Sequence, residues 1–195
     1  MTQHQVQHYI PVRDAWLAAR QEEIIDPGQI IIDPHHHLWD RPGWRYLLDE
    51  FLADLKSGHN VKATVYVQAR SMHRATGPEA LKPVGETEFV TGIAAMFASG
   101  IYGDIAANAG IVGYADLTLG DAVQPVLEAH MAAAGGRFRG IRHIATWDPV
   151  PAMLNPAYTP AEDMMESAAF RAGFAALGRN GLSFDAWIYF HQIPR

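Results

Sequence analysis

Two histidines early in the chain have the spacing that a metal or catalytic site requires. The run Ile30-Ile31-Ile32 leads into Asp33-Pro34-His35-His36-His37, and consecutive β-branched residues are typical of a parallel strand buried on both faces. Side chains alternate faces along a strand, so we expect His35 and His37 to project side by side, with Asp33 on the same face. Two imidazoles on one rigid element can bind a divalent cation. The alternative is a histidine-rich strand end without a ligand.

The motif Asp-x-His-x-His at the end of a first hydrophobic strand resembles that of the amidohydrolase superfamily. The ten residues Ile31 to Asp40 are similar to the family called amidohydrolase 2, described as metal-dependent hydrolases with the TIM-barrel fold. That family includes sugar lactonases, dicarboxylate lactonases and some decarboxylases, and some of its lactonases work without metal. The resemblance covers the chain from about residue 12 onward. It implies that His35 and His37 bind a divalent metal, of which zinc is the first candidate.

Composition narrows the classes of protein to which the chain can belong. Its 195 residues suffice for one domain, and 49% apolar with 18% charged residues is typical of a soluble globular protein. The net charge of −6 argues against a nucleic-acid partner. Without cysteine, any metal must use His, Asp, Glu or a modified Lys. Residues 1–9 lack the apolar region of a signal peptide, and no run approaches the roughly 18 apolar residues of a membrane span. We expect a cytoplasmic protein with a small-molecule substrate, no membrane partner and the capacity to form a homo-oligomer.

Strand and helix patterns alternate five times, which predicts a parallel α/β fold without hairpins. We expect an N-terminal arm and helix over 1–28, with the helix at 12–25 laid across one end of the fold. The remaining strands and helices follow within 29–195. Strands are expected at 29–35, 62–68, 111–117, 138–144 and 182–189, and helices at 47–55, 87–99, 121–134 and 164–177.

The spacing of these strands bears on the fold class. Their starts imply about 38 residues per unit, whereas a complete (β/α)8 barrel needs roughly 250 residues. We therefore expect a TIM-barrel type domain over 29–195 that is incomplete and truncated to about five strands. An open edge would then favour association with a partner. A doubly wound open sheet is the alternative, although no Gly-x-Gly-x-x-Gly follows the first strand.

In both folds the loops after the strands carry the active site. Arg142 suits a carboxylate or lactone oxygen because guanidinium binds it bidentately, although a structural ion pair is an equal alternative. Gln68 ends the second strand and could hydrogen-bond substrate. Trp39, with Trp44 and Trp147, could form an apolar wall for an organic substrate or simply pack the mouth of the barrel.

Several other residues have a functional and a structural interpretation. We assign Asp33 to catalysis as a group that holds a histidine tautomer, with a structural cap as the alternative. Asp116 could line the site or serve as an N-cap, and Glu86 could reach the pocket or face a helix dipole. His130 falls on the apolar face of a helix and is expected to be a core histidine. The resemblance implies a third histidine from the fifth or sixth strand, and His191 in Tyr-Phe-His-Gln is the candidate.

The expected function is metal-dependent hydrolysis of a lactone, ester or amide bond in a small organic acid or sugar lactone. In the superfamily the general base is an aspartate at the end of the eighth strand, so it cannot be assigned within these five strands. Two alternatives stay open. One is a metal-dependent non-oxidative decarboxylase, and the other is a non-catalytic barrel fragment that needs a partner.

Overall fold

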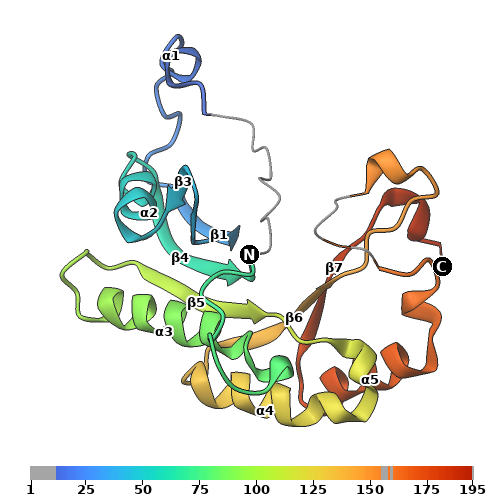
Figure 1. Ribbon diagram of the computed structural model, residues 1–195. Coiled ribbons are helices and arrows are strands. Elements are labelled where there is room, and N and C mark those ends of the chain that lie inside the picture. The colour runs from blue at the N-terminus through green and yellow to red at the C-terminus, as the bar shows by residue number, and fades with distance from the viewer. Residues whose placement is uncertain (1–11, 155–157, 159, 195) are drawn as a thin grey trace.

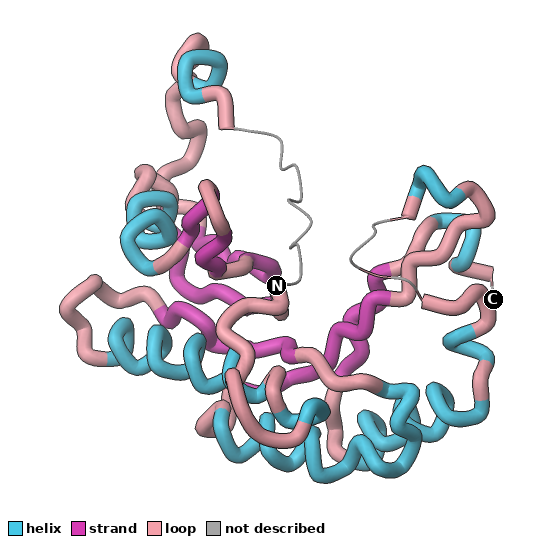
Figure 2. The backbone as a smooth tube through the Cα atoms, viewed as in Figure 1, coloured by secondary structure: helices cyan, strands magenta, loops and turns pink. Residues whose placement is uncertain are grey.

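The computed structural model describes residues 12–154, 158 and 160–194. Its centre is a five-stranded sheet in the order β1-β4-β5-β6-β7 in which all neighbouring strands are parallel. The strands are β1 (Ile30–His36), β4 (Asn60–Val67), β5 (Ala106–Gly113), β6 (Phe138–Ile144) and β7 (Ser183–Trp187). The sheet curls into an arc, with helices along its convex side (Figures 1 and 2). The predicted parallel α/β plan is confirmed, and the sheet is a curled half-barrel.

Helices cover the convex face and enclose the core. They are α2 (Leu48–Leu55), α3 (Val84–Ala98), α4 (Gln124–Ala133) and α5 (Ala168–Arg179). Short 3-10 turns lie in the connections, namely η1 (Glu79–Leu81), η2 (Leu117–Val123), η3 (Pro151–Met153), η4 (Met164–Glu166) and η5 (Phe190–Gln192). The core consists of apolar side chains from both layers, among them Tyr66, Ile111, Leu127, Ile141 and Leu177. No helix in the described part of the chain is long and apolar enough to cross a membrane.

The first strand is covered on one face only. Ile30 and Ile32 are 61% and 63% exposed, so the expectation that the isoleucine run is buried on both faces is wrong. Ile30 and Ile32 belong to β1, which is an outer strand of the sheet. The helices α3, α4 and α5 lie on the convex side of the sheet (Figure 1). The concave side is therefore the face on which polar side chains can meet a ligand.

The N-terminal helix is much shorter than predicted. Only α1 (Asp14–Leu17) forms within 12–25, and none of its residues is buried. Trp16 and Leu17 are 65% and 57% exposed, so this helix is not packed across the end of the fold. A helix of so few residues gains little from its own hydrogen bonds. The expected arm at residues 1–11 lies outside the described residues.

A β-hairpin replaces the expected loop after the first strand. The strands β2 (Trp39–Arg41) and β3 (Trp44–Tyr46) pair antiparallel, with Arg41 opposite Trp44. Pro42 and Gly43 form the turn, and Gly43 has a φ of +76°. Proline followed by glycine at positive φ is the pattern of a type II turn. The expectation of a fold without hairpins is therefore wrong.

Other boundaries differ by a few residues. β6 matches its predicted range, whereas β5 begins at Ala106 and ends at Gly113, several residues before the predicted limits. Asp116 consequently lies beyond the strand, where its Oδ1 accepts the Thr118 N–H at 2.9 Å and caps η2. The N-cap interpretation of Asp116 is confirmed.

Candidate active site

The strand end of β1 presents His35 and His37 together. Their Nε2 atoms are 3.2 Å apart and their rings meet edge to face. His36 turns away from them, is buried, and stacks on Phe51 with ring centroids 4.2 Å apart. Its Nε2 lies 3.0 Å from the Thr64 hydroxyl. The alternation of side chains along the strand thus produces a pair of imidazoles on one face.

The proton position on His37 follows from its backbone contact. Its Nδ1 lies 2.7 Å from the carbonyl oxygen of Val67, and a carbonyl can only accept. Nδ1 therefore carries the hydrogen, and when the ring is neutral Nε2 presents a lone pair toward His35. Burial lowers the pKa of His37, so this neutral form dominates near pH 7. Metal-binding histidines commonly donate their other N–H to a carbonyl in this way.

Arg142 extends from β6 to the histidine pair. Its Nη2 lies 3.0 Å from His35 Nε2, and the same guanidinium forms two contacts with Asp185 of β7, at 3.2 and 3.1 Å. Arg142 is buried, and its guanidinium carbon lies 5.1 Å from the centre of the Trp187 ring. Burial and the Arg142 charge lower the pKa of His35. The predicted ion pair is present, and it also joins β6 and β7 to β1 across the arc.

The histidine pair fits part of a metal site. Two nitrogen ligands of a tetrahedral zinc lie roughly 3.3 Å apart when each bond is about 2.05 Å, close to the observed 3.2 Å. However, Arg142 donates to the same His35 nitrogen that a cation would use. Among the described residues, no group of three or more His, Cys, Asp or Glu side chains is arranged around a common point. A cation bound by both histidines would therefore need Arg142 to move and other ligands to complete its shell.

Asp33 serves the backbone in this structure. Its Oδ1 accepts the N–H of His35 at 3.0 Å, at the place where the register between β1 and β4 shifts. Of its two predicted roles, the cap is the one present. The role of holding a histidine tautomer belongs to the Val67 carbonyl, which contacts His37.

His191 lies away from the strand ends, on η5. Its Nε2 contacts the Trp147 carbonyl at 3.1 Å, and its Nδ1 lies 3.8 Å from Asp148. These contacts fix it against the loop after β6. The structure does not bring His191 into a metal-binding group with His35 and His37 within the described residues.

The β2–β3 hairpin places Trp39 beside the histidine pair. The Trp39 ring is 5.9 Å from that of His37 and 4.6 Å from that of Trp44. Trp147, by contrast, lies in the loop that holds His191. The predicted aromatic wall is therefore divided, with two tryptophans next to the pair.

A cavity of about 740 Å³ opens at the carboxyl ends of β4, β5 and β6. Its polar lining includes Gln68, Arg70, His73, Tyr114, Asp116 and His143. Sequence reasoning predicted that Gln68 binds substrate, and Gln68 lines this cavity, but no role was assigned to His143 or Tyr114. The signal for His143 was its position next to Arg142, since neighbouring residues at the end of one strand serve opposite faces.

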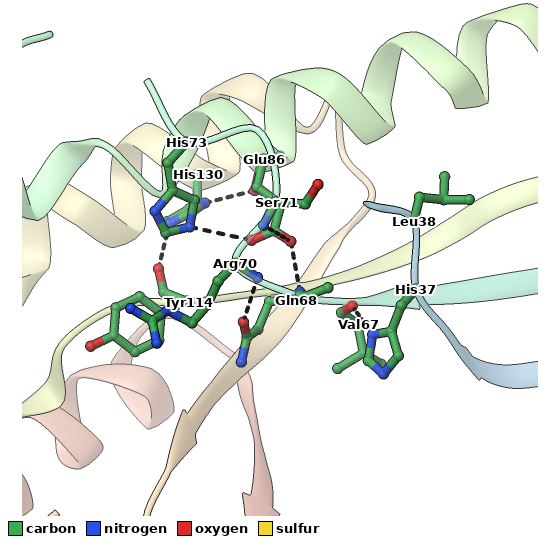
Figure 3. A network of polar contacts seen from close by, with 12 residues as sticks. His37, Leu38, Val67, Gln68, Arg70, Ser71, His73, Glu86, Tyr114 and His130 are labelled. Carbon is green, nitrogen blue, oxygen red and sulfur yellow. Dashed lines mark hydrogen bonds and ion pairs between the residues drawn. The ribbon is translucent and has the colours of Figure 1, made fainter. Parts of the chain in front are cut away.

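Glu86 organises the loop that borders this cavity (Figure 3). It lies in the first turn of α3 and is only 2% exposed. Its Oε1 accepts from the Tyr66 hydroxyl at 2.7 Å and from the N–H groups of Ala69 and Ser71 at 2.6 and 3.2 Å. The second oxygen lies 3.6 Å from His73 Nε2. The predicted helix-start position is confirmed, and the carboxylate also stabilises the loop backbone.

The same loop has an unusual backbone conformation. Arg70 and Met72 have φ values of +57° and +52°, which non-glycine residues adopt at a cost of about 1–3 kcal/mol each. The charge-assisted hydrogen bonds of Glu86 offset that cost.

His130 is a core histidine, as predicted. It is fully buried between the Thr87 hydroxyl, 2.8 Å from Nδ1, and the Tyr114 carbonyl, 2.9 Å from Nε2. Burial lowers its pKa to about 4.

The chain is 32% identical over 185 residues to a protein of Sinorhizobium fredii (strain NBRC 101917 / NGR234) named "Uncharacterized protein y4mH". The alignment covers 84% of this chain and 55% of that protein, so the chain spans little more than half of its relative. No protein-family model matches the chain, and no solved structure shows significant similarity to it. These comparisons indicate no chemical activity, so the function must be inferred from the geometry of the site.

Proposed function

We propose that the chain is part of an amidohydrolase-type hydrolase with a TIM-barrel architecture, acting on a lactone, ester or amide of a small organic acid or sugar. The observation that carries this proposal is the pair of Nε2 atoms 3.2 Å apart at the carboxyl end of β1, with His37 held in one tautomer. Its position at the carboxyl end of a strand in a curled parallel sheet is where barrel enzymes carry their chemistry.

The chain's own residues supply a donor, an acceptor and an apolar wall. Arg142 can bind a carbonyl oxygen and stabilise the negative charge that develops on it. Asp185 orients the guanidinium through two contacts, while Trp39 shields one side of His37. A divalent cation bound by His35 and His37, with zinc the first choice for imidazole ligands, would polarise the carbonyl and lower the pKa of a water molecule.

Hydrolysis assays with histidine variants test the proposal. The purified chain is incubated with a panel of sugar and dicarboxylate lactones, and with aromatic and muconate-type acids whose decarboxylation releases CO2. We expect lactone hydrolysis, with kcat/KM reduced by about a hundredfold or more in His35→Ala and His37→Ala. His59→Ala is the matched control, because His59 is exposed and precedes β4, at the end of the strands opposite to His35 and His37. Equal rates in all three variants, or CO2 release in place of hydrolysis, would contradict the proposal.

Metal content is tested separately. We expect purified protein to carry a divalent metal that is lost in His35→Ala and retained in His59→Ala, as measured by elemental analysis. Lactone hydrolysis that persists after complete chelation would remove the cation from the mechanism. In that case Arg142 and the histidines themselves bind the substrate oxygen.

A further inference from the structure

The cavity beyond the histidine pair has a wall of hydrogen-bond donors. Its lining includes Gln68, which directly follows Val67, the residue whose carbonyl contacts His37. A volume of about 740 Å³ is in the range of pockets that hold small organic molecules. The chemistry of its wall depends on which atoms of Gln68 and His143 face the cavity.

His143 is a fixed donor. Its Nδ1 accepts the backbone N–H of Leu117 at 3.2 Å, so the neutral ring carries its hydrogen on Nε2. The residue is 8% exposed, and burial lowers its pKa despite the opposing effect of Asp116. The neutral tautomer with Nε2–H is therefore the form present at pH 7.

Gln68 is a second fixed donor. Its Oε1 accepts the backbone N–H of Arg70 at 3.2 Å, which assigns the other amide atom as nitrogen. Figure 3 shows that nitrogen turned away from the Arg70 backbone. Gln68 is 2% exposed, so its two N–H groups point from a buried side chain that lines the cavity.

The wall carries charges of both signs, from Arg70 and Lys82 and from Glu79 and Asp116, so the fixed donors rather than the net charge select an acceptor ligand. Asp116 is engaged by the Thr118 N–H and hydroxyl at 2.9 and 2.6 Å, although its Oδ1 also lies 4.0 Å from His143 Nδ1. Glu79 is paired with Lys82 at 2.6 Å. The Arg70 guanidinium carbon lies 5.0 Å from the centre of the Tyr158 ring, and its positive charge also acts on Tyr114.

We propose that this cavity binds the carboxylate of a small organic acid, with Gln68 Nε2 and His143 Nε2 as donors and Arg70 as the countercharge. Apolar residues complete the lining and suit the hydrocarbon body of such an acid, namely Ala80, Pro83, Ile144 and Met164. This assignment goes beyond the proposed hydrolase and does not depend on it, because binding is measured without turnover.

A matched acid and amide distinguish a carboxylate pocket from a general apolar one. Benzoate and benzamide are titrated into the full wild-type chain at pH 7.5 and followed by calorimetry and by protein NMR shifts. We expect saturable benzoate binding that is at least tenfold tighter than benzamide binding, with shifts at residues around the cavity. Equal affinities, or no saturable benzoate binding at millimolar concentration, would overturn the proposal.

A charge-matched pair of variants locates the site. Gln68→Glu retains an oxygen for the Arg70 N–H but replaces the amide donor with a negative charge, and we expect it to weaken benzoate binding at least tenfold. Gln29→Glu adds the same charge at an exposed residue just before β1, at the opposite ends of the strands from Gln68, and should leave affinity within twofold. Wild-type affinity in Gln68→Glu contradicts the assignment. If that variant does not fold by circular dichroism, the acid–amide comparison on the wild type decides alone.

Discussion

Backbone groups set the proton positions of two site histidines in opposite ways. His37 donates through Nδ1 to the Val67 carbonyl, whereas His143 accepts through Nδ1 from the Leu117 N–H. One ring thus presents a lone pair to its surroundings and the other presents a donor. Such second contacts determine what each imidazole can bind.

This difference is directly measurable. In long-range ¹H–¹⁵N spectra of the histidine rings at pH 7.5, we expect the Nδ1–H tautomer for His37 and the Nε2–H tautomer for His143. Because burial lowers the pKa of both rings, both rings should be neutral at this pH. His37→Ala and His143→Gln assign the two resonances. The same tautomer for both rings would contradict the structure.

The sequence predicted which side chains meet at the end of β1 better than it predicted which residues of other strands contact them. Strict alternation placed His35 and His37 together, because both belong to β1 and the segment just after it. The Arg142 contact with His35 joins strands that are separated by β4 and β5 in the sheet order. It depends on the curl of the sheet, which no local pattern records. His191 was misplaced because alternation was extended past Trp187, where β7 ends and η5 follows.

At the scale of elements, a carboxylate on α3 determines the shape of the loop after β4. Glu86 binds the hydroxyl of Tyr66 in β4 and two N–H groups of the loop, which then returns to the start of the same helix. The strand, the loop and the helix are therefore one connected unit, and the cavity wall at Gln68 and Arg70 depends on it.

Removal of that carboxylate should destabilise the fold strongly. Glu86→Ala leaves three buried donors without their acceptor, and we expect the free energy of unfolding to fall by about 3 kcal/mol or more. Glu86→Gln keeps one oxygen and should cost less. Glu88→Ala is the control on the same helix, since its ion pair with Arg74 is partly exposed and should contribute about 0.5 kcal/mol or less. Urea unfolding of the three variants measures these differences, and equal losses at Glu86 and Glu88 would refute the role given to Glu86.

Element boundaries were predictable where local chemistry and tertiary pairing agree. β6 follows Gly135-Gly136 and contains Phe138, Ile141 and Ile144, and its predicted range is correct. The first half of β5 reads Ala-Ala-Asn-Ala-Gly, which has low intrinsic strand propensity. It becomes a strand because it pairs with β4, and the sequence does not express that pairing locally.

For the whole molecule, the core contains two neutral histidines in separate regions. His36 stacks on Phe51 beneath β1, and His130 of α4 lies between Thr87 of α3 and the Tyr114 carbonyl after β5. Burial lowers the pKa of each to about 4. The unfolded chain therefore binds more protons than the folded chain between about pH 4 and 6.5. Folding stability should rise with pH across that window and be lost as the pH falls through it.

The two histidines should make the chain sensitive to mild acid. Each lowered pKa implies that folding stability decreases by about 2 kcal/mol between pH 7 and pH 5. His130→Gln removes one titrating group while keeping an amide that can donate to the Tyr114 carbonyl. We expect this variant to be less stable than wild type at pH 7 but to lose about 2 kcal/mol less on going to pH 5. Urea unfolding at both pH values gives the difference. If His130→Gln loses as much stability as wild type, then His130 is already charged in the folded state at pH 5. Its contacts with Thr87 and Tyr114 would then need a different proton arrangement.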